Sequence, residues 1–173
     1  MRFFALLLSG LLLCCQTVQA QIRSYDTMIE SGVLKVAVYE DFAPYSFKDH
    51  DQPRGVDVDL AAALAKALGV RMELLWAPPG EKLDDDLRDS IWRGSALRNQ
   101  QLADVMMRVP YDRDYSLKRD DQGELANGHV VMFGPYQTEC WQVAYDRRRM
   151  DAVPSVAVFQ EHPIGVEVDS IPS

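Results

Sequence analysis

Three short, mostly apolar runs, separated by stretches long enough for one helix each, constrain this chain more than any other feature. The runs begin near residues 33, 71 and 103, and the first, Val33–Tyr39, contains three valines. Runs of this kind are typical of strands buried on both faces of a parallel sheet. Parallel neighbours need a crossover connection of a dozen or more residues. The spacing therefore predicts repeated strand–helix–strand units and an α/β fold.

The segments around these strands carry helix signals. Tyr25–Ser31 is a predicted short helix that ends at Gly32. Asp57 is placed to cap a helix that runs to Leu68. The two apolar helical stripes comprise Leu60, Leu64 and Leu68 in that helix and Leu83, Leu87 and Ile91 in the next. Shorter strands are predicted at 130–133, 141–145 and 164–168, and residues 40–55 and 111–128 read as surface loops.

Aromatic residues gather in the loop that follows the first predicted strand. Phe42, Tyr45 and Phe47 come directly after the end of that strand. In open α/β sheets, ligands collect at the carboxyl ends of the strands. Packing within the loop accounts for Phe47. For Phe42 and Tyr45, loop packing and the lining of a ligand cleft remain open alternatives.

Several function classes find little support in the sequence. It contains no Gly-rich phosphate loop, no Gly-x-Ser-x-Gly and no Cys-x-x-Cys, and the three histidines have no spacing suited to a metal. We therefore predict no cofactor, no metal and no catalytic residues. With 18 Lys and Arg against 26 Asp and Glu, the net charge is −8. An acidic chain without a basic stripe is a poor binder of nucleic acid or anionic lipid.

The first twenty residues have the pattern of a secretory signal peptide. Arg2 precedes an apolar run to Cys15, and the segment ends in Val18-Gln19-Ala20, with small residues at the two positions that a signal peptidase recognises. Cleavage is expected after Ala20, which predicts a periplasmic protein. The apolar run is shorter than the roughly 20 residues of a membrane-spanning helix, and no later segment is apolar enough to span. Cys140 is then the one remaining cysteine, so no intrachain disulfide is expected.

Five segments resemble family 3 periplasmic solute-binding proteins. They are GVLKVAVYEDFAPYSF (Gly32–Phe47), GVDVDLAAALAKALGV (Gly55–Val70), LADVMM (Leu102–Met107), FGPY (Phe133–Tyr136) and HPIGVEVDS (His162–Ser170). The resemblance implies a type II periplasmic binding protein-like α/β fold, with two lobes that close on a solute by hinge motion. It assigns residues 1–20 to the signal peptide, 21–138 to an incomplete first lobe, 139–146 to the inter-lobe crossing and 147–173 to the start of the second lobe. The sequence is accordingly expected to be truncated.

The resemblance also implies a set of ligand-binding residues. Phe42 occupies the position of an aromatic that stacks on the ligand, and Tyr45 lies beside it in the same loop. Asp169 and Ser170 occupy a helix start that usually meets the ligand's carboxylate, although Asp169 would repel an anion. An arginine is also expected after the third strand, because it donates two parallel hydrogen bonds to a carboxylate. Arg108 and Arg113 are the alternatives for this role.

Three shorter segments carry a narrower resemblance. ADVMMRVPYDR (Ala103–Arg113), VVMFGPY (Val130–Tyr136) and HPIGVEVDSIPS (His162–Ser173) resemble the binding-protein-like subfamily associated with quinoprotein alcohol dehydrogenases, including the accessory protein of methanol oxidation. The first hypothesis is therefore a non-enzymatic periplasmic component that binds a small organic solute, or a pyrroloquinoline-quinone dehydrogenase with its cytochrome c. The alternative is a receptor that delivers a polar ligand such as an amino acid to an ABC permease. A third hypothesis is an enzyme on the same scaffold, such as a dehydratase with a carboxylate in the cleft.

Overall fold

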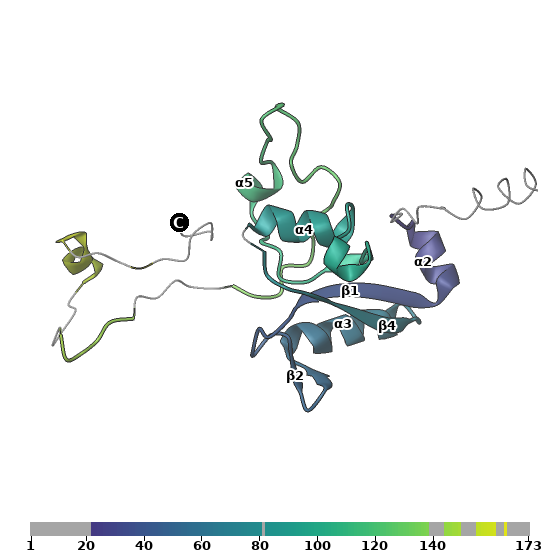
Figure 1. Cartoon of the computed structure of the whole chain (residues 1–173), viewed down its shortest axis with the longest axis horizontal. Helices are drawn as coiled ribbons and strands as arrows, with labels where there is room; N and C mark the ends of the chain where they lie inside the picture. The colour runs from purple at the N-terminus through teal and green to yellow at the C-terminus, as the bar shows by residue number, and fades with distance from the viewer. Residues whose placement is uncertain (1–21, 81, 139–143, 150–154, 162–164, 166–173) are drawn as a thin grey trace, which may run out of the picture.

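A three-stranded parallel sheet organises the chain. The computed structural model describes residues 22–80, 82–138, 144–149, 155–161 and 165. The strand order is β4-β1-β5, with β1 at Val33–Tyr39, β4 at Arg71–Ala77 and β5 at Val105–Met106 (Figure 1). Val36 of β1 is in register with Leu74 on one side and with Val105 on the other. The predicted α/β fold with parallel strands is therefore confirmed.

Helices cover both faces of this sheet. Helix α3 (Val56–Ala67) lies against one face and α4 (Leu83–Ile91) against the other, as Figure 1 shows. Alternation along β1 matches this arrangement, because Leu34, Val36 and Val38 join Ala61 and Ala65 of α3 in one buried cluster. Ala37 points the other way and packs with Leu75, Ala103 and Ile91 in a second cluster. Burial on both faces explains the apolar character of β1.

Helix α2 agrees with the sequence prediction, whereas α3 differs from it in its first residue and in its buried face. Helix α2 spans Tyr25–Ser31 and ends at Gly32, which has φ 65°. Both bounds agree with the prediction. In α3, however, the N-cap residue is Gly55 and not Asp57, whose side chain is fully buried. The leucine stripe of α3 is also not its buried face, because the helix buries Asp57, Val58, Ala61 and Ala65. The small side chains of Ala61 and Ala65 let the helix approach the sheet closely.

Other segments differ from the predictions in length or type. The predicted loop 40–55 contains an antiparallel hairpin of β2 (Phe47–Asp49) and β3 (Gln52–Arg54). Strand β5, in the apolar run that begins near residue 103, is 2 residues long. Residues 130–133 form no strand, and Val131 and Phe133 are 84% and 67% exposed. The apolar pattern was present there, but the segment has no ladder partner among the described residues.

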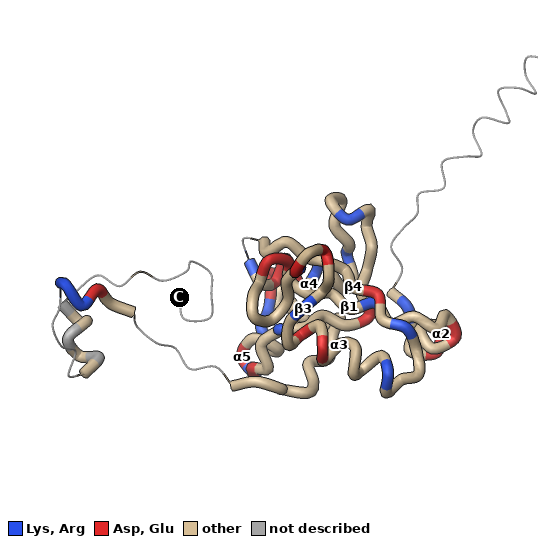
Figure 2. The backbone as a smooth tube through the Cα atoms, turned by 90° about the horizontal axis from the view of Figure 1, so that it is seen from below, with Lys and Arg blue, Asp and Glu red and all other residues tan. Residues whose placement is uncertain are grey.

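The remaining elements are short. They are α5 (Arg113–Ser116) and the 3-10 helices η2 (Ala96–Arg98) and η3 (Val156–Glu161). The predicted signal peptide, Cys140, and most of the strands predicted at 141–145 and 164–168 lie outside the described residues. Within the described ranges, none of the helices has the length and apolarity that crossing a bilayer requires. Figure 2 shows basic and acidic residues interspersed on the part of the chain that the structure describes, without a continuous basic stripe.

Candidate functional site

Three aromatic rings and one guanidinium meet at the carboxyl end of the sheet. Tyr39 is the last residue of β1, and its ring centroid lies 6.0 Å from that of Phe42. Phe42 stacks in turn on Tyr45, with centroids 5.7 Å apart. The Arg108 guanidinium, which follows β5, lies 3.6 Å from the Tyr45 centroid and 5.2 Å from the Phe42 centroid. We call these four residues the aromatic–arginine cluster.

Backbone hydrogen bonds and one serine hydroxyl hold the loop that carries Phe42 and Tyr45. The amide of Phe42 donates to the Ser46 carbonyl at 2.8 Å, and the buried Ser46 hydroxyl donates to the Tyr39 carbonyl at 2.6 Å. The Tyr45 carbonyl accepts the Asp57 amide at 2.9 Å. A Cβ atom at Gly55 would lie 2.1 Å from the Tyr45 carbonyl oxygen. The start of α3 therefore packs directly against the loop, and only glycine fits at that contact.

Arg108 adopts a conformation that a side-chain-bearing residue rarely takes. Its φ is 60°, and such a conformation persists only where neighbouring structure determines it. Its backbone amide donates to the Tyr136 hydroxyl at 3.0 Å. That hydroxyl donates to Asp57 Oδ1 at 2.9 Å. Residues from three separate segments thus converge behind the aromatic–arginine cluster.

A partly buried carboxyl lies behind Tyr39. Asp86, in the first turn of α4, accepts the Tyr39 hydroxyl at 2.9 Å and the Gly80 amide at 2.7 Å. Burial raises the pKa of Asp86, in opposition to these two hydrogen bonds, which lower it. Burial and the neighbouring Asp86 carboxylate also raise the pKa of Tyr39. Asp86 is consequently a titratable carboxyl with a raised pKa beside the cluster.

The structure brings together some of the predicted site residues. Phe42, Tyr45 and Arg108 lie in one cluster, whereas Arg113 is exposed at the start of α5 and, among the described residues, makes none of the ring contacts of Arg108. Asp169 and Ser170 lie outside the described residues.

Sequence reasoning did not single out Tyr39, Asp86 or Tyr136. Tyr39 and Tyr136 each lie at the end of a segment that the sequence did mark, one at a strand end and one after Gly-Pro. Asp86 is one of three consecutive aspartates in the first turn of α4, a pattern that by itself indicates a solvated helix start. In the described part of the chain, no group of three or more His, Cys, Asp or Glu residues is arranged to hold a metal ion.

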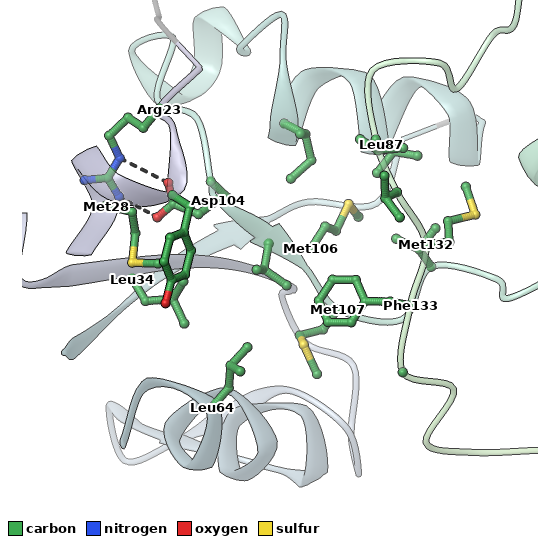
Figure 3. A pocket seen from close by; sticks show the side chains of 18 of the residues that line it. Arg23, Met28, Leu34, Leu64, Leu87, Asp104, Met106, Met107, Met132 and Phe133 are labelled. Atoms are coloured by element: carbon green, nitrogen blue, oxygen red, sulfur yellow. Dashed lines mark hydrogen bonds and ion pairs between the residues drawn. The ribbon is translucent and has the colours of Figure 1, made fainter. Parts of the chain in front are cut away.

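An apolar cavity of about 700 Å³ lies along the outer edge of β5. Tyr136 is among its lining residues, whereas Phe42, Tyr45 and Arg108 are not. Figure 3 shows Leu64 of α3, Leu87 of α4 and Phe133 around it. The leucine stripe of α3 lines this cavity, which explains why that stripe is not the buried face. At one end, the Arg23 side chain is paired with Asp104, which also accepts the Lys35 amide at 2.7 Å.

Comparison with known proteins finds a family match for the region that contains the sheet. Residues 34–117 match the model of the bacterial extracellular solute-binding proteins, family 3. A cyclohexadienyl dehydratase from Pseudomonas aeruginosa is 32% identical over 107 residues, which are 60% of this chain and 40% of the relative. The chain thus spans about two fifths of the length of that curated relative.

Two solved structures are also similar. An ancestral cationic amino acid solute-binding protein has 40% sequence identity and a TM-score of 0.32, covering 37% of this chain and 27% of its own. An ancestral cyclohexadienyl dehydratase has 37% identity and a TM-score of 0.33, covering 40% of this chain and 27% of its own.

One prediction is corrected by these comparisons. We expected a non-enzymatic protein because the sequence lacks familiar catalytic motifs. The curated relative matched over 107 residues is by its name an enzyme, a dehydratase. Motif absence was a weak argument, because function depends on the site and one scaffold can host both binding and catalysis. The predicted solute-binding fold, in contrast, agrees with the family match. Residues 34–117, which span nearly all of the parallel sheet, are similar to the bacterial extracellular solute-binding proteins, family 3.

Proposed function

We propose that this protein binds a small organic solute with a carboxylate group, of the amino acid class, at the carboxyl end of its sheet. The observation that supports this proposal is the aromatic–arginine cluster. The Arg108 guanidinium supplies a planar pair of donors suited to a carboxylate. Phe42, which is 43% exposed, and Tyr45 supply apolar faces beside it. This combination of one charge and flat apolar surface is typical of small-ligand sites.

The names of the similar proteins agree with this ligand class. One is described as an amino acid solute-binding protein, and the family comprises extracellular solute-binding proteins. We therefore favour a receptor that the predicted signal peptide directs to the periplasm and that delivers its solute to an ABC permease. The relatives lend no support to association with a quinoprotein dehydrogenase and its cytochrome c, and that role stays a prediction from the sequence.

Titration of the full chain with L-arginine and L-glutamate, followed by calorimetry and thermal unfolding, tests the proposal. A ligand that binds the folded state raises its stability by RT ln(1 + [L]/Kd). Arg108→Gln should weaken binding by roughly 10- to 100-fold, because a hydrogen bond to a charged group contributes about 1.5–3 kcal/mol. Arg113→Gln is the matched control and should leave binding unchanged. Absence of any stabilisation, or equal losses in both variants, would contradict the proposal.

A dehydratase is the second candidate function, favoured by the curated relative and by Asp86. Elimination of water needs an acid that protonates the departing hydroxyl and a base that takes the proton lost from the neighbouring carbon. Asp86, with its raised pKa and its hydrogen bond to Tyr39, is the candidate acid.

Incubation with a hydroxylated cyclohexadienyl acid tests this candidate, because loss of water makes the ring aromatic and changes its ultraviolet absorbance. Asp86→Asn should abolish that change while leaving binding in place. Asp89→Asn, which alters another carboxylate of α4, should not. A wild-type chain that binds the compound without any absorbance change would exclude this function.

A further inference from the structure

Asp57 is linked to both partners of the arginine–tyrosine stack, to Tyr45 directly and to Arg108 through Tyr136. Its backbone amide donates to the carbonyl of Tyr45, which carries the ring. Its side chain accepts the hydroxyl of Tyr136, which in turn accepts the amide of Arg108. Asp57 is fully buried and fixed in the first turn of α3. One buried residue is therefore hydrogen-bonded to the backbone that carries the Tyr45 ring and, through Tyr136, linked to the backbone that carries the guanidinium.

The hydrogen bond of the Arg108 amide is accepted by a side chain, the hydroxyl of Tyr136. A positive φ at arginine is disfavoured by contact between Cβ and the backbone. The direction of its N–H bond follows from this φ, and the hydroxyl of Tyr136 receives that N–H at 3.0 Å. The Tyr136 hydroxyl is thus bonded to the Arg108 backbone in the conformation in which the guanidinium lies over Tyr45. The next residue, Gln137, donates to the Tyr45 hydroxyl at 2.9 Å, so the same segment also contacts the ring directly.

We propose that Tyr136 is a positioning residue that holds Arg108 on the face of Tyr45 through its hydroxyl, with Asp57 as its anchor. Its effect on ligand affinity rests on the proposed function, whereas its effect on the geometry of Arg108 does not. The two bonds made by the hydroxyl span 79 and 28 residues of sequence. Partial burial and the Asp57 carboxylate raise the pKa of Tyr136, so the hydroxyl keeps its proton at neutral pH.

The first test is a spectroscopic readout of the full chain that needs no ligand. The Nε proton of an arginine stacked on a tyrosine face is shifted upfield by the ring current, and Arg108→Lys identifies its signal. Tyr136→Phe should return this signal to the position of an unstacked arginine. Tyr111→Phe is the matched control, since it removes a hydroxyl from a tyrosine that is 63% exposed. An upfield shift retained in Tyr136→Phe would overturn the inference.

A second measurement covers the case in which Tyr136→Phe does not fold. In the unaltered chain, hydrogen exchange of the Arg108 amide should be slowed at least about tenfold relative to an unstructured chain, because its N–H is hydrogen-bonded. Exchange at the unstructured rate would overturn the inference.

Titration with L-arginine and L-glutamate separates this inference from the proposed function. Where the unaltered chain binds either compound, Tyr136→Phe should weaken binding about tenfold. Unchanged affinity would overturn the positioning role. Failure of both compounds to bind the unaltered chain counts against the proposed function, and the ring-current and exchange measurements then decide the position of Arg108.

Discussion

Replacement of Gly55 by alanine should destabilise the protein more than any other single methyl addition at a glycine of positive φ. Gly55 has φ 118° and ψ 166°, a region that is essentially restricted to glycine. The added Cβ would lie 2.1 Å from the Tyr45 carbonyl oxygen and 2.4 Å from its carbonyl carbon. Ordinary van der Waals contact begins at 3.4 Å. The loop that carries Tyr45 must therefore move by more than an ångström.

Two costs contribute to the expected loss of stability. Holding alanine in this backbone region costs about 1–3 kcal/mol. Displacement of a packed backbone costs about 1–3 kcal/mol more. Together they predict a decrease of about 4 kcal/mol in the free energy of unfolding. In urea denaturation followed by circular dichroism, the midpoint should fall by about 2 M for a slope of about 2 kcal/mol/M.

Gly123→Ala is the control for backbone conformation without crowding. Gly123 has φ 84°, and a Cβ there would meet no heavy atom within 4 Å. This substitution should cost about 1–2 kcal/mol. If Gly55→Ala costs no more than Gly123→Ala, the close approach of α3 to the Tyr45 loop is not what requires glycine, and the reasoning fails.

Two further predictions concern carboxylates. Because the pKa of Asp86 is raised in the folded state, this group stabilises the fold below its ordinary pKa of 3.8, and the stabilisation is lost as the pH rises through the raised pKa. Asp86→Asn should therefore flatten this part of a plot of urea midpoint against pH. An unchanged slope would contradict the raised pKa of Asp86. Asp104→Ala removes both the partner of Arg23 and the acceptor of the Lys35 amide, so it should lower the free energy of unfolding by about 2–3 kcal/mol. A double-mutant cycle with Arg23→Ala that gives additive losses would show that the pair does not interact.

Local patterns were sufficient to predict a strand that is buried on both faces and a helix that ends at a glycine. Strand β1 is buried on both faces, so its apolar run was visible without knowledge of its neighbours. Helix α2 carries its stop signal in Gly32, whose positive φ is a local requirement. The position of Phe42 and Tyr45 at the end of β1 followed from their place directly after the predicted strand, and their role as ligand residues stays a prediction.

Tertiary contacts decided what periodicity left open. Helix α3 has two stripes at helical spacing, and only packing against the sheet determined that alanines and Val58 face the core while the leucines line the cavity. The segment 130–133 has the apolar pattern of a strand but no ladder partner in the described part of the chain, and a strand cannot form without one.

The choice between Arg108 and Arg113 also lay beyond the sequence, because both are arginines after the same strand. The structure places Arg108 on the rings through bonds from Tyr136 to residues 28 and 79 positions away. The order of residues determined which local elements form, since a helix or strand signal depends on near neighbours. The site depends on contacts between distant segments, and only the folded chain brings those segments together.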